Sequence, residues 1–175
     1  MHYKNTLSKY GFISKVLHWL SAALLIVQIP LGFYLVDLDF GDERLEIEKI
    51  HVIMGLTIFY LVILRLLNNL INPTPKLNPS SFFGQKIIAK LNHVLLYLAI
   101  LSITISGILK KLFNGETLNI FFKKIEIQNN FDLADKFYDV HIFSNYLIII
   151  LIALHIMAVI VHKVFFKENL LKKIV

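Results

Sequence analysis

Residues 140–164 have the sequence VHIFSNYLIIILIALHIMAVIVHKV, a stretch long and apolar enough to cross a lipid bilayer. The same stretch contains His141, His155 and His162. Because an imidazole is costly to place in hydrocarbon, histidines inside a membrane span indicate a functional site. The sequence therefore predicts a transmembrane helix whose histidines take part in the function of the protein.

The spacing of these histidines predicts that they share one side of the helix. Fourteen residues separate His141 from His155, close to four whole turns at about 3.6 residues per turn. Their rings then lie roughly 21 Å apart along the axis, at about 1.5 Å of rise per residue. His162 follows after seven more residues and returns to that side. One helix is thus expected to present an imidazole toward each membrane surface.

The composition is that of an integral membrane protein. Of 175 residues, 57% are hydrophobic and 17% are charged, and the mean hydropathy is +0.67, too apolar for an ordinary soluble domain. We expect a single domain over residues 1–175. The net charge of +6 is better explained by an uneven distribution across a membrane than by nucleic-acid binding. The chain has no cysteine, which excludes disulfides, thiolate metal sites, iron–sulfur clusters and covalent c-type haem.

Four segments, about 16–36, 50–71, 91–109 and 140–164, reach the roughly 20 apolar residues that a span needs. With their flanks they predict helices over about 12–36, 48–71, 86–110 and 137–166, an all-α membrane protein built as a four-helix transmembrane bundle. The first connection is acidic, and the second, residues 72–86, is rich in proline and is expected to be non-helical. The third, about 110–139, is expected to hold a short amphipathic helix near Leu118–Ile125.

The distribution of Lys and Arg predicts the orientation. The side that holds both termini and the second connection has eleven: Lys4, Lys9, Lys15, Arg65, Lys76, Lys86, Lys90, Lys163, Lys167, Lys172 and Lys173. The other side has seven: Arg44, Lys49, Lys110, Lys111, Lys123, Lys124 and Lys136. Both termini are therefore expected in the cytoplasm.

This orientation places four histidines at two matched depths. His51 and His141 lie near the outer ends of the second and fourth spans, whereas His18 and His155 lie toward the inner side on the first and fourth. Two histidines from facing helices of a bundle can bind a haem between them, so the sequence predicts haems in the bundle core. An iron with two protein ligands passes single electrons and has no vacant position for oxygen.

Small residues about one turn after each histidine favour this interpretation, because a porphyrin needs room; they are Ser21, Ala22, Gly55, Ser144, Asn145 and Ala158. Arg65 follows His51 by fourteen residues and is expected either to pair with a propionate of the inner haem or to reach the headgroups. Lys49 and Lys136 are candidates for the outer propionates. His93 and His162 are left open between quinone contact, propionate contact and anchoring.

Four stretches together resemble the bacterial cytochrome b561 family: KVLHWLSAALLIVQIPLGFYL, IEKIHVIMGLTIFYLVILRLLNNLINPTP, LNHVLLYLAILSITISGIL and LHIMAVIVHKVFFKENLLKKI. The resemblance implies an inner-membrane protein with two non-covalent b haems. It implies His18 and His155 as ligands of the cytoplasmic-side haem and His51 and His141 as ligands of the periplasmic-side haem. It also implies electron exchange with ubiquinone, and some members oxidise superoxide.

The leading hypothesis is an oxidoreductase that moves electrons from a periplasmic one-electron partner, superoxide, to ubiquinone. A second is a cytochrome subunit that anchors a dehydrogenase or hydrogenase and passes its electrons to quinone. A third, from another class, is a haem-free bundle whose histidines bind a metal or relay protons. The acidic first connection opposes an anionic substrate unless lysines of the outer side focus it locally.

Overall fold

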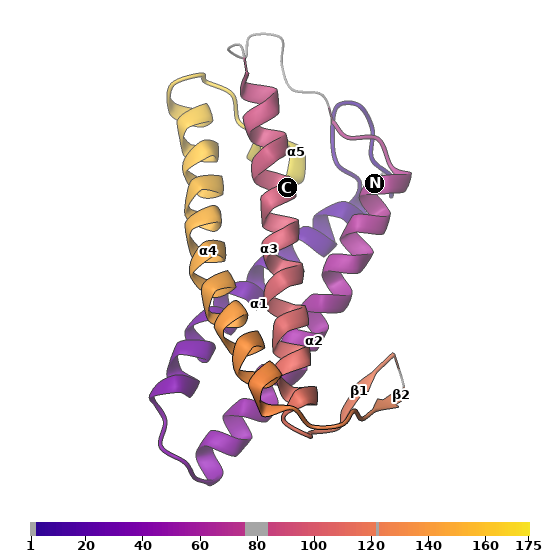
Figure 1. The fold of residues 1–175 in the computed structure, drawn as a ribbon. Coiled ribbons are helices and arrows are strands. Elements are labelled where there is room, and N and C mark those ends of the chain that lie inside the picture. The colour runs from indigo at the N-terminus through magenta and orange to yellow at the C-terminus, as the bar shows by residue number, and fades with distance from the viewer. Residues whose placement is uncertain (1–2, 76–83, 122) are drawn as a thin grey trace.

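The computed structural model of the chain describes residues 3–75, 84–121 and 123–175, and long helices make up most of it (Figure 1). They are α1 (Phe12–Asp37), α2 (Asp42–Ile71), α3 (Gln85–Phe113) and α4 (Phe131–Val164). Each of the four is long and apolar enough to cross a membrane. The predicted fold class, an all-α membrane protein with a four-helix transmembrane bundle, is confirmed.

Two helices begin earlier than the apolar pattern predicts, because polar residues extend them beyond the hydrophobic span. Asp42 and Glu43 occupy the first turn of α2, where negative charge is favourable next to the helix N-terminus. At the start of α4, the side chain of Asn130 accepts a hydrogen bond of 3.0 Å from the backbone N–H of Leu133. Such an N-cap satisfies a backbone donor that would otherwise lack a partner.

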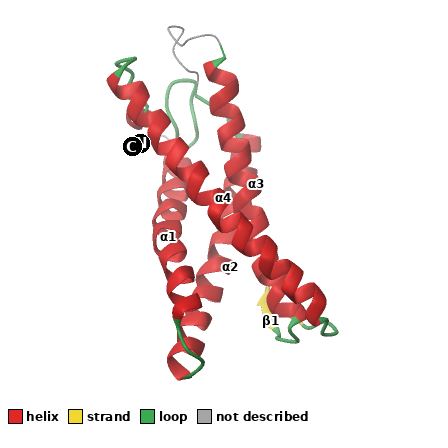
Figure 2. Ribbon diagram, turned by 60° about the vertical axis from the view of Figure 1, so that its left-hand side comes forward, coloured by secondary structure: helices red, strands yellow, loops and turns green. Residues whose placement is uncertain are grey.

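The helices form two hairpins that cross at an angle, α1 with α2 and α3 with α4, as both views show (Figures 1 and 2). Helix α2 also packs on α3. The centre of the bundle is a buried apolar cluster made by Leu25, Ile58, Val62, Ala99, Ile100, Ile148 and Leu151. Many large apolar side chains outside this cluster are exposed, as expected of helices whose outer surface faces lipid rather than water.

The helix expected near Leu118–Ile125 is wrong, and the segment is a β-hairpin. Strands β1 (Leu118–Ile120) and β2 (Lys123–Ile125) pair antiparallel. Leu118 and Ile120 are buried on either side of exposed Asn119, so the pattern has the two-residue period of a strand. The hairpin packs against the end of α3, and Tyr60 of α2 accepts a hydrogen bond of 2.9 Å from the N–H of Phe121.

The C-terminal segment folds back beside the start of α1, at the end of the bundle opposite the β-hairpin (Figure 1). It contains the short helix α5 (Leu171–Ile174). The N–H of Tyr10 donates to the carbonyl of Lys173 and the indole N–H of Trp19 to that of Ile174, both at 3.1 Å. Within the predicted non-helical connection 72–86, α3 already begins at Gln85, and residues 76–83 lie outside the described residues.

Candidate functional site

The histidine pairs expected from the sequence come together in the bundle. We call His51 and His141 the outer pair, and His18 and His155 the inner pair, with the end that carries both termini taken as inner. The ring centroids of the outer pair are 6.2 Å apart and those of the inner pair 6.5 Å. Each pair joins α4 to another helix, α2 for the outer pair and α1 for the inner pair.

These separations suit one metal ion between two imidazoles. A bond from a metal to an imidazole nitrogen is about 2 Å long. Since the ring centre lies about 1 Å behind that nitrogen, two rings on opposite sides of one ion have centres roughly 6 Å apart. Both pairs have this spacing without any change in the helices.

A cavity of about 690 Å³ surrounds the outer pair and is lined by all four long helices. This volume lies within the range of pockets that hold small molecules and cofactors. The deep part of the lining is apolar and includes Leu25, Ile58 and Ile148. Charged side chains lie only at its outer end; those among the described residues are Asp37, Glu48, Lys110, Lys111 and Asp139.

Each outer histidine lies against a glycine of a neighbouring helix. A Cβ atom on Gly32 of α1 would be 3.2 Å from Cε1 of His51. A Cβ atom on Gly107 of α3 would be 3.0 Å from Cε1 and 3.1 Å from Nδ1 of His141. Neither glycine is predicted from the sequence, because spacing within one helix points only to small residues on the helix that carries each histidine. An isolated glycine within an apolar span, which often marks a close approach, was the signal available.

Gly55, which the sequence predicts to leave room for a cofactor, lines the cavity around the outer pair. A Cβ atom there would be 3.5 Å from Nε2 of Gln28. That Nε2 atom donates a hydrogen bond of 3.0 Å to the backbone carbonyl of His51. The Gln28 amide thus joins α1 to α2 beside the outer pair, and a Cβ atom at position 55 would be in ordinary van der Waals contact with it. Gln28 also lines the cavity, and the sequence analysis missed it.

The outer histidines differ in the partners of their Nδ1 atoms. Nδ1 of His141 lies 2.8 Å from the backbone carbonyl oxygen of Ile103. Since a carbonyl only accepts, Nδ1 carries the proton and Nε2 keeps a lone pair for a metal ion. Nδ1 of His51 is buried and has no hydrogen-bond partner among the residues that the structure describes.

Arg65 and His93 lie beside the inner pair. The guanidinium of Arg65 donates to Nδ1 of His18 over 3.1 Å and lies 5.4 Å from the ring centre of Tyr97. Arg65 therefore faces the inner site, as its spacing from His51 predicts. The ring of His93 on α3 is 5.3 Å from that of His155, so three imidazoles gather at this depth.

The remaining candidates lie elsewhere. Lys49 and Lys136, expected at the outer propionates, do not line the cavity, and Lys110 and Lys111 line it instead. The turn at the end of α3 brings these two lysines over the opening, which the sequence alone does not reveal. His162 is buried, and its Nδ1 lies 3.3 Å from Oε2 of Glu168.

Comparison with known proteins identifies the family. A family model described as prokaryotic cytochrome b561 matches residues 9–175. Cytochrome b561 homolog 2 of Escherichia coli (strain K12) is 31% identical over 122 residues, which cover 69% of this chain and 65%, slightly under two thirds, of that relative. The probable superoxide oxidase CybB of Yersinia pestis is 27% identical over 169 residues, 93% of either chain. The chain belongs to the prokaryotic cytochrome b561 family, which implies b-type haem and a role in electron transport.

Proposed function

We propose that this protein binds two b haems, one between the outer pair and one between the inner pair, and transfers electrons from a periplasmic one-electron donor to ubiquinone. The observation that carries the proposal is the ring spacing of the two pairs, 6.2 and 6.5 Å, at two levels of one transmembrane bundle. When bound, each haem supplies an iron that changes its charge by a single electron.

The residues of the outer site fit such a group. His51 and His141 would hold the iron, and Gly32 and Gly107 leave the imidazoles unobstructed. The carbonyl of Ile103 keeps the proton of His141 on Nδ1, which orients the ring and raises the basicity of Nε2. The apolar lining of the cavity would exclude water and so help to set the potential.

The inner pair can bind a haem iron if the contact between Arg65 and His18 changes. A guanidinium can only donate, so Nδ1 of His18 accepts from Arg65. A neutral His18 presents the lone pair of Nε2 to iron only when the proton is on Nδ1. Binding through Nε2 therefore requires Arg65 to release Nδ1. The released guanidinium would then be available to a propionate, for which its paired N–H groups are well suited.

Superoxide is the donor that we propose first, supported by the relative named as a probable superoxide oxidase. In the overall reaction, two superoxide anions are oxidised to two molecules of dioxygen. Their two electrons, with two protons, reduce one ubiquinone to ubiquinol. The excess of Lys and Arg on the side of the termini supports a multi-pass protein of the inner membrane with both termini in the cytoplasm.

The acidic outer end favours a second candidate, a cytochrome subunit that takes electrons from a dehydrogenase or hydrogenase. Asp37, Glu48 and Asp139 line the cavity there, and carboxylates repel an anionic substrate. Purification in mild detergent separates the candidates, because the second predicts a large partner that copurifies with the chain.

The test is an absorption spectrum followed by stopped-flow kinetics. Protein made with haem available should show a Soret band and a dithionite-induced α-band. Superoxide should then reduce it rapidly, and added ubiquinone should reoxidise it. A colourless protein would contradict haem binding, whereas a haem protein that superoxide does not reduce would contradict the proposed donor alone.

A further inference from the structure

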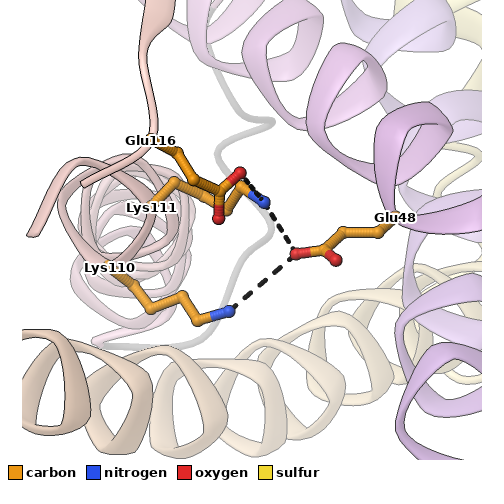
Figure 3. Close-up of polar contacts among 4 residues, drawn as sticks. All are labelled: Glu48, Lys110, Lys111 and Glu116. Atoms are coloured by element: carbon orange, nitrogen blue, oxygen red, sulfur yellow. Dashed lines mark hydrogen bonds and ion pairs between the residues drawn. The ribbon is translucent and has the colours of Figure 1, made fainter. Parts of the chain in front are cut away.

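Glu48, Lys110 and Lys111 line the outer end of the cavity, and with Glu116 they form a cluster of four charged side chains (Figure 3). We propose that Lys110 and Lys111, positioned by Glu48, bind the propionates of the outer haem and raise its midpoint potential. This inference rests on the proposed function, since it requires a haem between His51 and His141.

The positions of these residues along their helices point them at the outer site. Lys110 and Lys111 follow Gly107, the glycine against His141, by three and four residues. Glu48 precedes His51 by three residues on α2. Residues three or four apart lie on one face of a helix. Figure 3 shows the two lysines reaching from α3 toward Glu48. These three residues line the cavity that surrounds the outer pair.

The cluster holds its charges in place at a partly buried position. The side chain of Lys111 is 12% exposed and that of Glu48 is 24% exposed. Nζ of Lys111 lies 2.8 Å from Oε1 of Glu48 and also pairs with Glu116. Nζ of Lys110, 31% exposed, lies 4.0 Å from the same Glu48 oxygen. A partly buried ammonium needs such partners to remain charged, and the shared carboxylate keeps both lysines at the opening.

The two cations of the cavity lie at the end where a bound haem would place its carboxylates. Among the described residues of the lining, Lys110 and Lys111 are the cations, and the other charged groups are Asp37, Glu48 and Asp139. Haem has two carboxylates on one edge and is otherwise apolar. The apolar part of the haem suits the deep, apolar part of the cavity lining. In that orientation the two carboxylates would lie at the charged outer end. There a carboxylate is attracted by the two ammonium groups and repelled by the three acids.

Positive charge beside a haem favours the reduced form, because reduction adds an electron and the added negative charge is attracted to the ammonium groups. Removing either lysine should therefore lower the outer potential. Removing Glu48 should raise it, because a negative charge is lost while the haem propionates still hold both lysines at the opening. A general loosening of the helices would not lower the midpoint potential in the lysine variants and raise it in the Glu48 variant.

The experiment is a potentiometric titration of the full-length purified protein, with the outer haem assigned from the His51→Ala variant. Lys110→Gln and Lys111→Gln should lower the midpoint of the outer haem and leave that of the inner haem unchanged. Glu48→Gln should raise the outer midpoint, and Lys111→Arg should keep it near the wild-type value. The matched controls are Lys49→Gln and Lys136→Gln, which remove the same charge from the same side but outside the cavity lining.

Each outcome separates this inference from the proposed function. A wild-type protein without the outer haem overturns both. The inference alone is overturned if the protein binds two haems but the outer midpoint shifts no more in Lys110→Gln and Lys111→Gln than in the control variants. It is also overturned by a slower reaction with superoxide at an unchanged midpoint, which would assign the lysines to the substrate anion. If Lys111→Gln does not fold, the other two variants still test the inference. It then requires a higher outer midpoint in Glu48→Gln and a lower one in Lys110→Gln.

Discussion

Gly107 lies directly against the imidazole of His141, so close that a Cβ atom would be 3.0 Å from Cε1 and 3.1 Å from Nδ1. Real side chains essentially never come closer to a Cβ atom than this. The orientation of His141 therefore depends on a residue that has no side chain, on a different helix. Gly32 has the same relationship to His51, at 3.2 Å.

We expect Gly107→Val to displace the His141 ring and to lose the outer haem while the inner haem is kept. A branched side chain at this contact forces the imidazole away, because close-packed interiors do not absorb added volume. The haem content of the purified variant, measured against protein, should fall toward one per chain. Gly41→Ala is the control, since a Cβ atom there meets nothing within 4 Å. Unchanged haem content in Gly107→Val would contradict the account.

Loss of a single ligand should remove one haem and leave the other. His51→Ala or His141→Ala should remove the outer haem, and His18→Ala or His155→Ala the inner one, because an iron site with one protein ligand holds a non-covalent haem weakly. Spectra of the purified variants, compared for α-band position, measure which haem remains.

His93→Ala and His162→Ala serve as the contrast to these variants. Both should retain two haems. The His93 ring is 5.3 Å from His155, closer than the roughly 6 Å that two ligands of one ion need, and Nδ1 of His162 lies 3.3 Å from Oε2 of Glu168. Loss of a haem in either variant would show that the inner pair is assigned wrongly.

Arg65→Gln should lower the midpoint potential of the inner haem. The guanidinium lies 3.1 Å from Nδ1 of His18, and removing a positive charge beside a haem favours its oxidised form. Redox titration of the variant measures the shift, with Arg44→Gln as the control, because Arg44 lies at the opposite end of the bundle. An inner midpoint that does not respond would contradict a role for the Arg65 charge in setting the potential of the inner haem.

Asn130→Ala should destabilise the protein by about 1 kcal/mol through loss of the N-cap of α4. The side chain of Asn130 accepts from the N–H of Leu133 at 3.0 Å, and alanine cannot replace this acceptor. Thermal unfolding in detergent, followed by circular dichroism, measures the effect. Asn129→Ala is a suitable control because it changes the same residue type one position earlier. Equal unfolding temperatures for the two variants would argue against the cap.

The sequence was sufficient for the spans and for the grouping of the histidines. Apolar length predicts the four helices, and the fourteen residues between His141 and His155 set both levels on one side of α4. The structure brings His51 and His18 to these levels, although haem ligation itself remains a prediction. The hairpin at Leu118–Ile125 was mistaken for a helix because its apolar and polar residues alternate over too few positions to separate the two periods.

What the sequence did not provide depends on how the helices cross. Gly32, Gly107 and Gln28 act on histidines of other helices, so their roles follow from contacts between elements and not from spacing within one. The same holds for Lys110 and Lys111, which are brought to Glu48 by the packing of α3 on α2. The sequence places Lys49, Lys110, Lys111 and Lys136 all on the outer side. Which of these lysines line the cavity becomes clear only once the ends of the helices are known.

The central claim is that two irons are each held between imidazoles of different helices, and electron paramagnetic resonance of the oxidised, purified protein tests it most directly. Two low-spin ferric signals, together accounting for two irons per chain, are the result that this account predicts. A high-spin signal from an iron with one protein ligand, or a total of one iron per chain, would contradict it.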